Sequence, residues 1–168
     1  MKTKLYVLLL TLLAILIASC AAVGKKSQPL PVVLNVTGSK VATEMKDWAG
    51  YKSLWHKAMK QKVVAAGRQM TIKEGDMIIP KEPGTLVEVS INDYSWVSVS
   101  TRFATGVNTD DAWVDVKIRF IDLQSGKQIG GLGYDRSSSR QLGGEFVIMT
   151  ERQVAKICKE IVAEIQKQ

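Results

Sequence analysis

The chain has 168 residues, of which 46% are hydrophobic and 23% are charged, and its formal net charge is +7 at pH 7. This composition is typical of one globular domain and excludes a disordered or fibrous protein. Two cysteines exclude a disulfide scaffold and a four-cysteine zinc site, and one histidine excludes the common metal sites with two or three histidines.

The amino-terminal segment has the layout of an export signal. Lys2 and Lys4 precede an apolar run over residues 5–18. This run is shorter than the about 20 apolar residues that a membrane-spanning helix needs, and small residues follow it. The pattern therefore predicts a cleaved signal peptide over residues 1–19.

The end of this signal resembles the lipobox of bacterial lipoproteins, because it reads Ile17-Ala18-Ser19-Cys20. The resemblance implies cleavage before Cys20, a diacylglycerol on its thiol, and anchorage in a membrane. Ala21, in place of an aspartate, implies sorting to the outer membrane in enteric-type bacteria. The alternative is an ordinary secreted protein with a chance cysteine at the cleavage site.

Residues 20–31 are predicted to form a lipidated tether, since Pro29 and Pro31 favour an extended chain. Residues 32–168 then form a single periplasmic domain. Without Lys2 and Lys4 the mature chain keeps 21 basic and 16 acidic residues, a net charge of +5. Such a charge suits contact with an anionic surface. Export makes nucleic acid an unsuitable partner.

The first half of the domain begins with a β-rich run over residues 32–38, which predicts a strand. A helix is expected to follow and to end near Gly67, with Ser53 as its N-cap or with a start as early as Thr43. Its apolar stripe recurs at helical spacing. The stripe consists of Trp48, Tyr51, Trp55, Met59, Val63 and Ala66.

The middle of the domain alternates between strands and loops. Residues 71–84 are expected to form a loop, because they contain two glycines and two prolines. Strands are predicted over residues 86–91 and 96–102, separated by a bend at Asn92-Asp93. Residues 103–112 are predicted to form a second loop.

The clearest strand is predicted over residues 113–121, where apolar and polar residues alternate strictly. Residues 122–127 are predicted to form a hairpin turn, with Gly126 at a position that favours a positive φ. The returning strand begins at Gln128 and is rich in glycine. Gly130, Gly131 and Gly133 are interpreted as sites of close packing rather than as a phosphate-binding loop.

The chain ends in a predicted amphipathic helix, with Thr150 as its N-cap and Gln153 in a capping box. The expected core face of this helix consists of Val154, Ile157, Cys158, Ile161 and Ile165. The element order predicts an α+β fold. We expect a mixed or antiparallel sheet of about four strands with two helices packed on one face.

This order resembles periplasmic lipoproteins such as the curli secretion lipoprotein and the amino-terminal domain of TolB. The resemblance is carried by the strand ending in Ile91-Asn92-Asp93-Tyr94, the hairpin over residues 114–127 and the terminal helix. It implies a domain that binds other envelope proteins. It supplies no catalytic residue.

A candidate binding face follows from the alternation of side chains along the strands. Trp96 and Trp113 are predicted to lie opposite the valine-rich face of the sheet. If the helices cover only the valine-rich face, both tryptophans are exposed to a partner protein or to glycan rings. The predicted face consists of Trp96, Trp113, Asp115, Lys117 and Arg119.

No catalytic, metal or cofactor site is predicted. His56 has no second histidine beside it, and Cys158 is expected to act as a small buried hydrophobe. Ser137–Ser139 lack a general base. The spacing of Asp110, Asp111 and Asp115 does not match a calcium-binding EF-hand loop.

The sequence therefore predicts a non-enzymatic lipoprotein, anchored through Cys20 to the periplasmic face of the outer membrane. It would bind another envelope protein as an accessory or assembly subunit. The alternative is a lipoprotein that binds glycan or peptidoglycan through Trp96 and Trp113.

Overall fold

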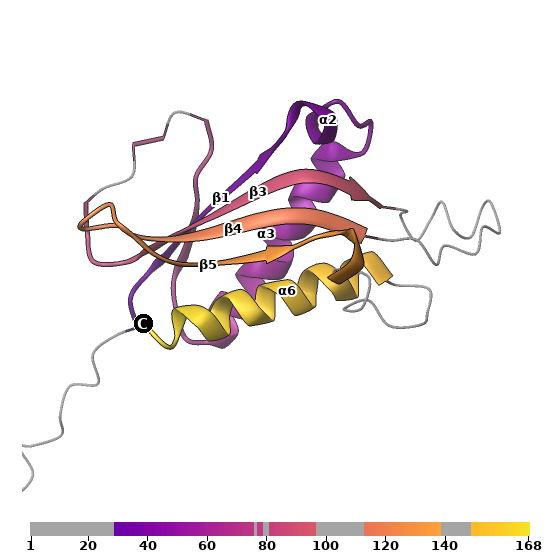
Figure 1. The fold of residues 1–168 in the computed structure, drawn as a ribbon. Coiled ribbons are helices and arrows are strands. Elements are labelled where there is room, and N and C mark those ends of the chain that lie inside the picture. Colours follow the sequence, from indigo (N-terminus) through magenta and orange to yellow (C-terminus); the bar gives the residue numbers. More distant parts are fainter. Residues whose placement is uncertain (1–28, 76, 79–80, 97–112, 139–148) are drawn as a thin grey trace, which may run out of the picture.

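The computed structural model describes residues 29–75, 77–78, 81–96, 113–138 and 149–168. These residues form one five-stranded sheet, a short helix and two long helices (Figure 1). The strands are β1 (Val32–Gly38), β2 (Met70–Ile72), β3 (Thr85–Ser95), β4 (Trp113–Asp122) and β5 (Gln128–Tyr134). The helices are α2 (Lys40–Thr43), α3 (Trp48–Ala65) and α6 (Met149–Ile165).

The sheet is mixed, with the strand order β2-β1-β3-β4-β5. β1 pairs in parallel with β2 and β3, whereas β3, β4 and β5 pair antiparallel. The α+β class and the mixed sheet are confirmed. β2 is an additional strand within a segment where a loop was expected, because three residues are too few to show a period.

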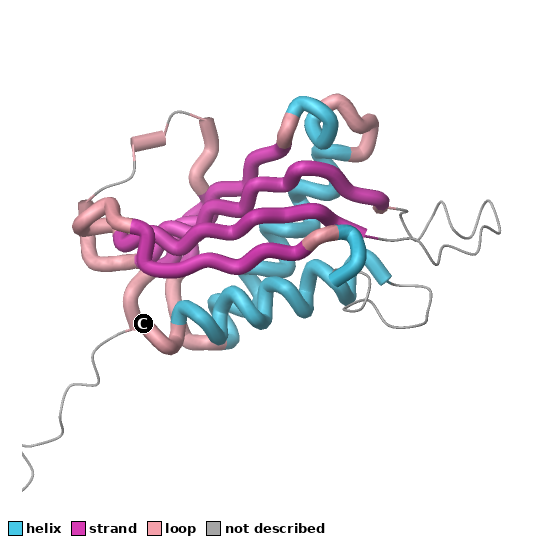
Figure 2. The backbone as a smooth tube through the Cα atoms, in the orientation of Figure 1, coloured by secondary structure: helices cyan, strands magenta, loops and turns pink. Residues whose placement is uncertain are grey.

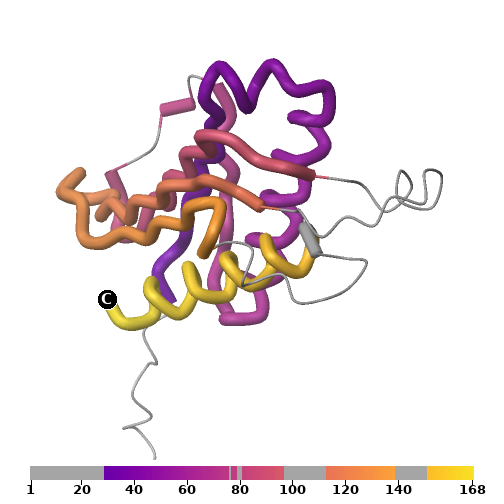
Figure 3. The backbone as a smooth tube through the Cα atoms, turned by 45° about the vertical axis from the view of Figure 1, so that its right-hand side comes forward, coloured from indigo at the N-terminus to yellow at the C-terminus, as the bar shows by residue number. Residues whose placement is uncertain are grey.

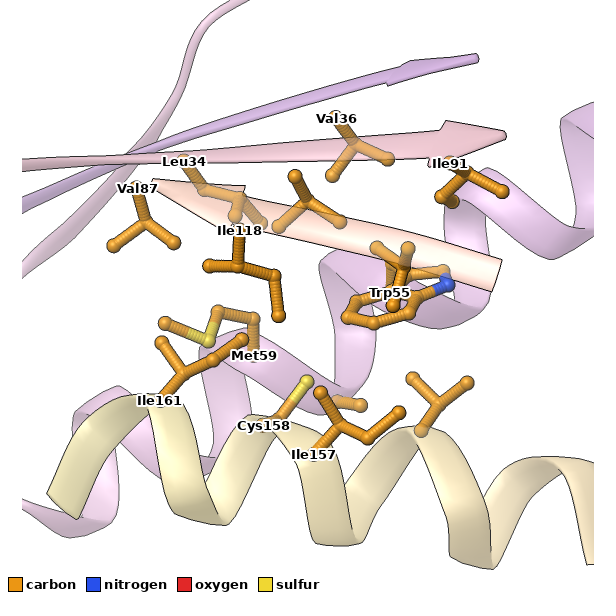
Figure 4. Close-up of a cluster of buried hydrophobic side chains, with 14 of the residues drawn as sticks. Leu34, Val36, Trp55, Met59, Val87, Ile91, Ile118, Ile157, Cys158 and Ile161 are labelled. Carbon is orange, nitrogen blue, oxygen red and sulfur yellow. The ribbon is translucent and has the colours of Figure 1, made fainter. Parts of the chain in front are cut away.

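The two long helices pack against each other and cover one face of the sheet (Figure 2). The view turned by 45° shows the same two layers (Figure 3). A core of buried side chains lies between the sheet and the helices. Figure 4 shows Ile118 of β4 directed toward Met59 of α3 and Ile161 of α6. Burying a side chain of this size stabilises the fold by about 1.5–3 kcal/mol.

The first helical region differs from the prediction. α2 is a separate short helix whose N-cap, Ser39, accepts a hydrogen bond from the backbone N–H of Ala42. α3 begins at Trp48, so neither Ser53 nor Thr43 starts it. The apolar stripe predicted the buried face of α3 correctly. The sequence predicts the start of the helix less well, because several residues before a helix are able to cap it.

β3 also differs from the prediction, because it continues through Asn92-Asp93 instead of bending there. A bulge between Ile91 and Asp93 shifts the register against β4. After the bulge, Tyr94 is buried on the same face as Ile91. The residue inserted at the bulge moves the side chains that follow to the opposite faces of the sheet. A prediction based on a strict period of two misses this change.

The β4–β5 hairpin agrees with the prediction. β4 begins at Trp113, and its turn closes through a hydrogen bond from the backbone N–H of Gly126 to the carbonyl of Asp122. Gly126 has a φ of 70°, which favours glycine. Among the described residues, no helix is long and apolar enough to cross a membrane.

Candidate functional site

The side of the sheet away from α3 and α6, here called the outer face, carries a row of polar side chains and one tryptophan. Alternation places Trp113, Asp115, Lys117 and Arg119 of β4 on this side, because Val114, Val116, Ile118 and Phe120 are buried against the helices. Neighbouring β3 contributes Glu88 and Asp93 to the same surface. These four residues of β4 therefore lie on one side of the sheet, and the binding role of that side stays a prediction.

Trp113 contacts a basic residue, Arg136, which is itself paired with an acidic one. The guanidinium carbon of Arg136 lies 4.0 Å from the centroid of the Trp113 ring, a cation–π geometry. An Nη atom of Arg136 also donates to Asp93 Oδ2 over 2.8 Å. Arg136 follows β5, and its contribution to the face was not predicted, since contacts between residues this distant in sequence leave no local pattern.

Two further pairs connect β3 to β4. Arg119 donates to the carboxylate of Glu88, its direct neighbour across the strands. Asn92 Nδ2 donates to Asp115 Oδ1 over 3.0 Å. Asp93 and Asp115 lie opposite one another in the register, and like charges at such positions repel. The partners Arg136 and Asn92 offset this repulsion.

A shallow, open hollow of about 560 Å³ begins at Asp115 and runs along β4 and β5. Gly131 and Gly133 of β5 contribute to its lining and add no side chain, while Lys117 and Asp135 add opposite charges. The backbone N–H and the hydroxyl of Ser138 donate to Asp135 Oδ1 over 2.7 and 2.9 Å. These bonds stabilise the carboxylate and lower the pKa of Asp135.

Trp96 does not belong to the outer face, and its predicted place beside Trp113 is wrong. The bulge in β3 turns Trp96 toward α3, where its ring centroid lies 5.9 Å from that of Tyr51. Tyr51 in turn stacks on Tyr94 with a centroid separation of 4.0 Å. Trp96 is therefore part of an aromatic cluster at the margin of the core.

This cluster includes a polar contact that the sequence does not reveal. The hydroxyl of Tyr94 donates to Asp47 Oδ1 over 2.7 Å, joining β3 to the start of α3. Burial and this bond raise the pKa of Tyr94. The contact stabilises the packing of strand against helix and presents no group to a ligand.

Two further candidates are at least partly covered by the fold. His56 is half-buried on α3, and Cys158 is fully buried, where burial raises the pKa of its thiol to about 12. Within the ranges that the structure describes, no group of three metal-ligating side chains is found. Cys20, Asp110, Asp111 and Ser139 lie outside those ranges.

No family model and no curated protein matches the chain. Solved structures that match include two PelC dodecamers from Paraburkholderia phytofirmans, one of them a point variant, and a neuraminyllactose-binding hemagglutinin homolog from Helicobacter pylori. The PelC structures show 14% and 13% identity and TM-scores of 0.46 and 0.39, covering 79% and 78% of this chain and 89% and 88% of PelC. The hemagglutinin homolog shows 12% identity and a TM-score of 0.41, covering 81% of this chain and 82% of its own. These values imply no shared function.

Proposed function

We propose that the protein is a non-enzymatic lipoprotein, anchored through Cys20 to the periplasmic side of the outer membrane, whose outer face binds another envelope protein. The lipobox sequence supports the anchorage. The observation that carries the binding role is the outer face itself, which α3 and α6 leave uncovered and which holds Trp113 among ordered charged groups.

The composition of this face suits a protein interface. Tryptophan and arginine dominate the binding energy of many interfaces, and Trp113, Arg119 and Arg136 lie on this one surface. Arg119 and Arg136 already have carboxylate partners, which restrain their side chains before a partner arrives. Such restraint reduces the entropy that binding costs.

A glycan-binding role is the second candidate, and the hollow over Gly131 and Gly133 favours it. Polar side chains line this hollow, and Trp113 lies on the adjacent strand. Trp96 no longer contributes, because it packs against α3. Arg136 occupies one side of the Trp113 ring, so a sugar that stacks there must displace it.

The test places a photo-crosslinking amino acid at single positions of the full chain in intact envelopes. Lys117 reports on the outer face, and exposed Ala163 of α6 is the matched control on the helix side. We expect a defined protein adduct from Lys117 and a different or absent adduct from Ala163. A Cys20→Ala chain should lose the adduct if anchorage brings the two proteins together.

The outcomes separate the two roles. A peptidoglycan adduct at Lys117 without a protein adduct would reject the leading proposal in favour of the glycan role. The same protein adduct from both positions would show that the outer face is not the docking surface.

A further inference from the structure

The surface of the helix layer has a charge pattern unlike that of the outer face. α3 contains four lysines and no acidic residue. Lys57 and Lys60 are exposed on the side opposite the buried Trp55 and Met59. Neither lysine forms an ion pair with any residue that the structure describes.

α6 carries three cations and three carboxylates, so it adds exposed basic residues to the helix layer but no net charge. Its exposed cations lie opposite the buried apolar face of the helix, and they are Arg152, Lys156 and Lys159. Two of its carboxylates have cationic or hydroxyl partners. Glu160 accepts a hydrogen bond from Tyr134 of β5, and Glu164 pairs with Lys167 over 2.7 Å.

We call these five cations the helix surface: Lys57, Lys60, Arg152, Lys156 and Lys159. Within the described ranges, none of the five forms an ion pair. The outer face, by contrast, carries equal numbers of both signs. Its charged residues are Glu88, Asp93, Asp115, Lys117, Arg119 and Arg136. Together α3 and α6 carry seven basic and three acidic residues, a net charge of +4 that comes from α3. The excess positive charge therefore lies on the helix side of the molecule.

The tether reaches the domain at the same end as the last turn of α3. The carbonyl of Leu30 accepts a hydrogen bond from Arg68 Nη1 over 3.1 Å, and Pro29 and Leu30 lie against Gly67. Figures 1 and 3 show the start of β1 beside this end of the helix layer. The chain from Cys20 to Pro29 spans at most about 30 Å when fully extended, so a lipid on Cys20 keeps this end close to the bilayer.

We infer that the helix surface lies against an anionic phospholipid bilayer, which is the membrane that holds Cys20. This inference rests on the proposed anchorage. Each basic side chain within a Debye length of an anionic leaflet strengthens contact by about fivefold. Because α3 and α6 cover one side of the sheet, this orientation turns the outer face toward water and toward a protein partner.

The experiment uses the full lipidated chain in vesicles that contain a headgroup-linked fluorescence quencher. One fluorophore is attached at Gln61→Cys, because Gln61 is an exposed residue of α3. In a separate chain the fluorophore is attached at Gly133→Cys on the outer face. An added Cβ at Gly133 meets only the Val116 carbonyl, at 4.0 Å. Cys158 is buried and should not react.

We expect strong quenching at Gln61 and weak quenching at Gly133 in vesicles of phosphatidylcholine with phosphatidylglycerol. In phosphatidylcholine alone, or at high salt, the difference should vanish. A four-glutamine variant (K57Q/K60Q/K156Q/K159Q) should weaken the docked orientation several hundredfold, on the order of fivefold per residue. The matched four-arginine variant keeps the charge and should behave like the native chain.

Flotation of the vesicles distinguishes the failure of anchorage from the failure of this inference. A chain that does not float contradicts the lipid anchor. A chain that floats, but is quenched equally at both positions or not at all at Gln61, overturns the orientation. If the cysteine of the Gln61→Cys chain were shielded from labelling in native envelopes but not in vesicles, the helix surface would instead bind an acidic protein.

Discussion

His56 illustrates how one half-buried side chain makes stability depend on pH. It is half-buried on α3, and its Nε2 atom has no hydrogen-bond partner among the described residues. Burial lowers the pKa of His56 below 6.5, and neighbouring Lys52 lowers it further, while Glu74 opposes them. The folded chain therefore holds the imidazole neutral under conditions in which the unfolded chain begins to take up a proton.

The sign of the effect follows from this difference. Above about pH 6.5 the imidazole is neutral in both states and does not make the free energy of unfolding depend on pH. Below that pH the unfolded state binds the proton more readily. The free energy of unfolding should consequently fall as pH drops through 6.5 toward the lower pKa of the folded state. Urea unfolding at about pH 7.5 and about pH 5.5 measures this fall.

The matched control is His56→Gln, which has no proton to exchange in this range. We expect the variant to lose less stability than the native chain between the two pH values. Equal losses in both chains would mean that carboxylates, and not His56, set the response.

At the scale of elements, the contact between α3 and the end of β3 determines where a glycine is required. An added Cβ at Gly50 would lie 2.8 Å from a ring carbon of Trp96. Alanine in a helix interior is usually about 1 kcal/mol better than glycine. Here we expect Gly50→Ala to lower the free energy of unfolding by about 1 kcal/mol, because Trp96 must leave its contact with Tyr51.

A double-mutant cycle measured by denaturant unfolding separates the two effects. In a Trp96→Ala chain the clash is removed, so Gly50→Ala should become stabilising, by up to about 1 kcal/mol. If Gly50→Ala had the same effect with and without Trp96, the ring would not be the cause.

The elements also show which features a sequence pattern reveals. The strict alternation of β4 and the stripe of α3 predict their buried faces, because burial acts on every second or every third to fourth residue. The bulge in β3 breaks that period, so the position of Trp96 was wrong while that of Trp113 was right. The contacts of Arg136 with Asp93 and Trp113 depend on the tertiary fold and leave no periodic signal.

At the scale of the whole molecule, the two layers divide the surface chemistry between them. The helices bury the apolar side of the sheet and present cations that lack partners within the described ranges. The sheet presents a face of balanced charge in which Arg119 and Arg136 already have acidic partners. Contact through unpaired cations should weaken strongly with salt, whereas contact through a balanced face should respond less.

This division predicts that the two surfaces can be disabled separately. In anchored full-length chains, the four-glutamine variant should lose quenching at Gln61 yet keep the protein adduct formed from Lys117. A Ser90→Arg substitution on the outer face should do the opposite, since it adds bulk beside Lys117, its neighbour across the strands. Here the adduct is followed from a crosslinker at Lys117, and the quenching from the probe at Gln61.

Circular dichroism and thermal unfolding must first show that both variants fold like the native chain. Ser90 is only partly buried, so we expect its substitution to change stability little. If either variant abolished both readouts while remaining folded, the helix surface and the outer face would act as one site. Membrane contact would then be a condition for partner binding, because only the docked orientation would bring the outer face within reach of the partner.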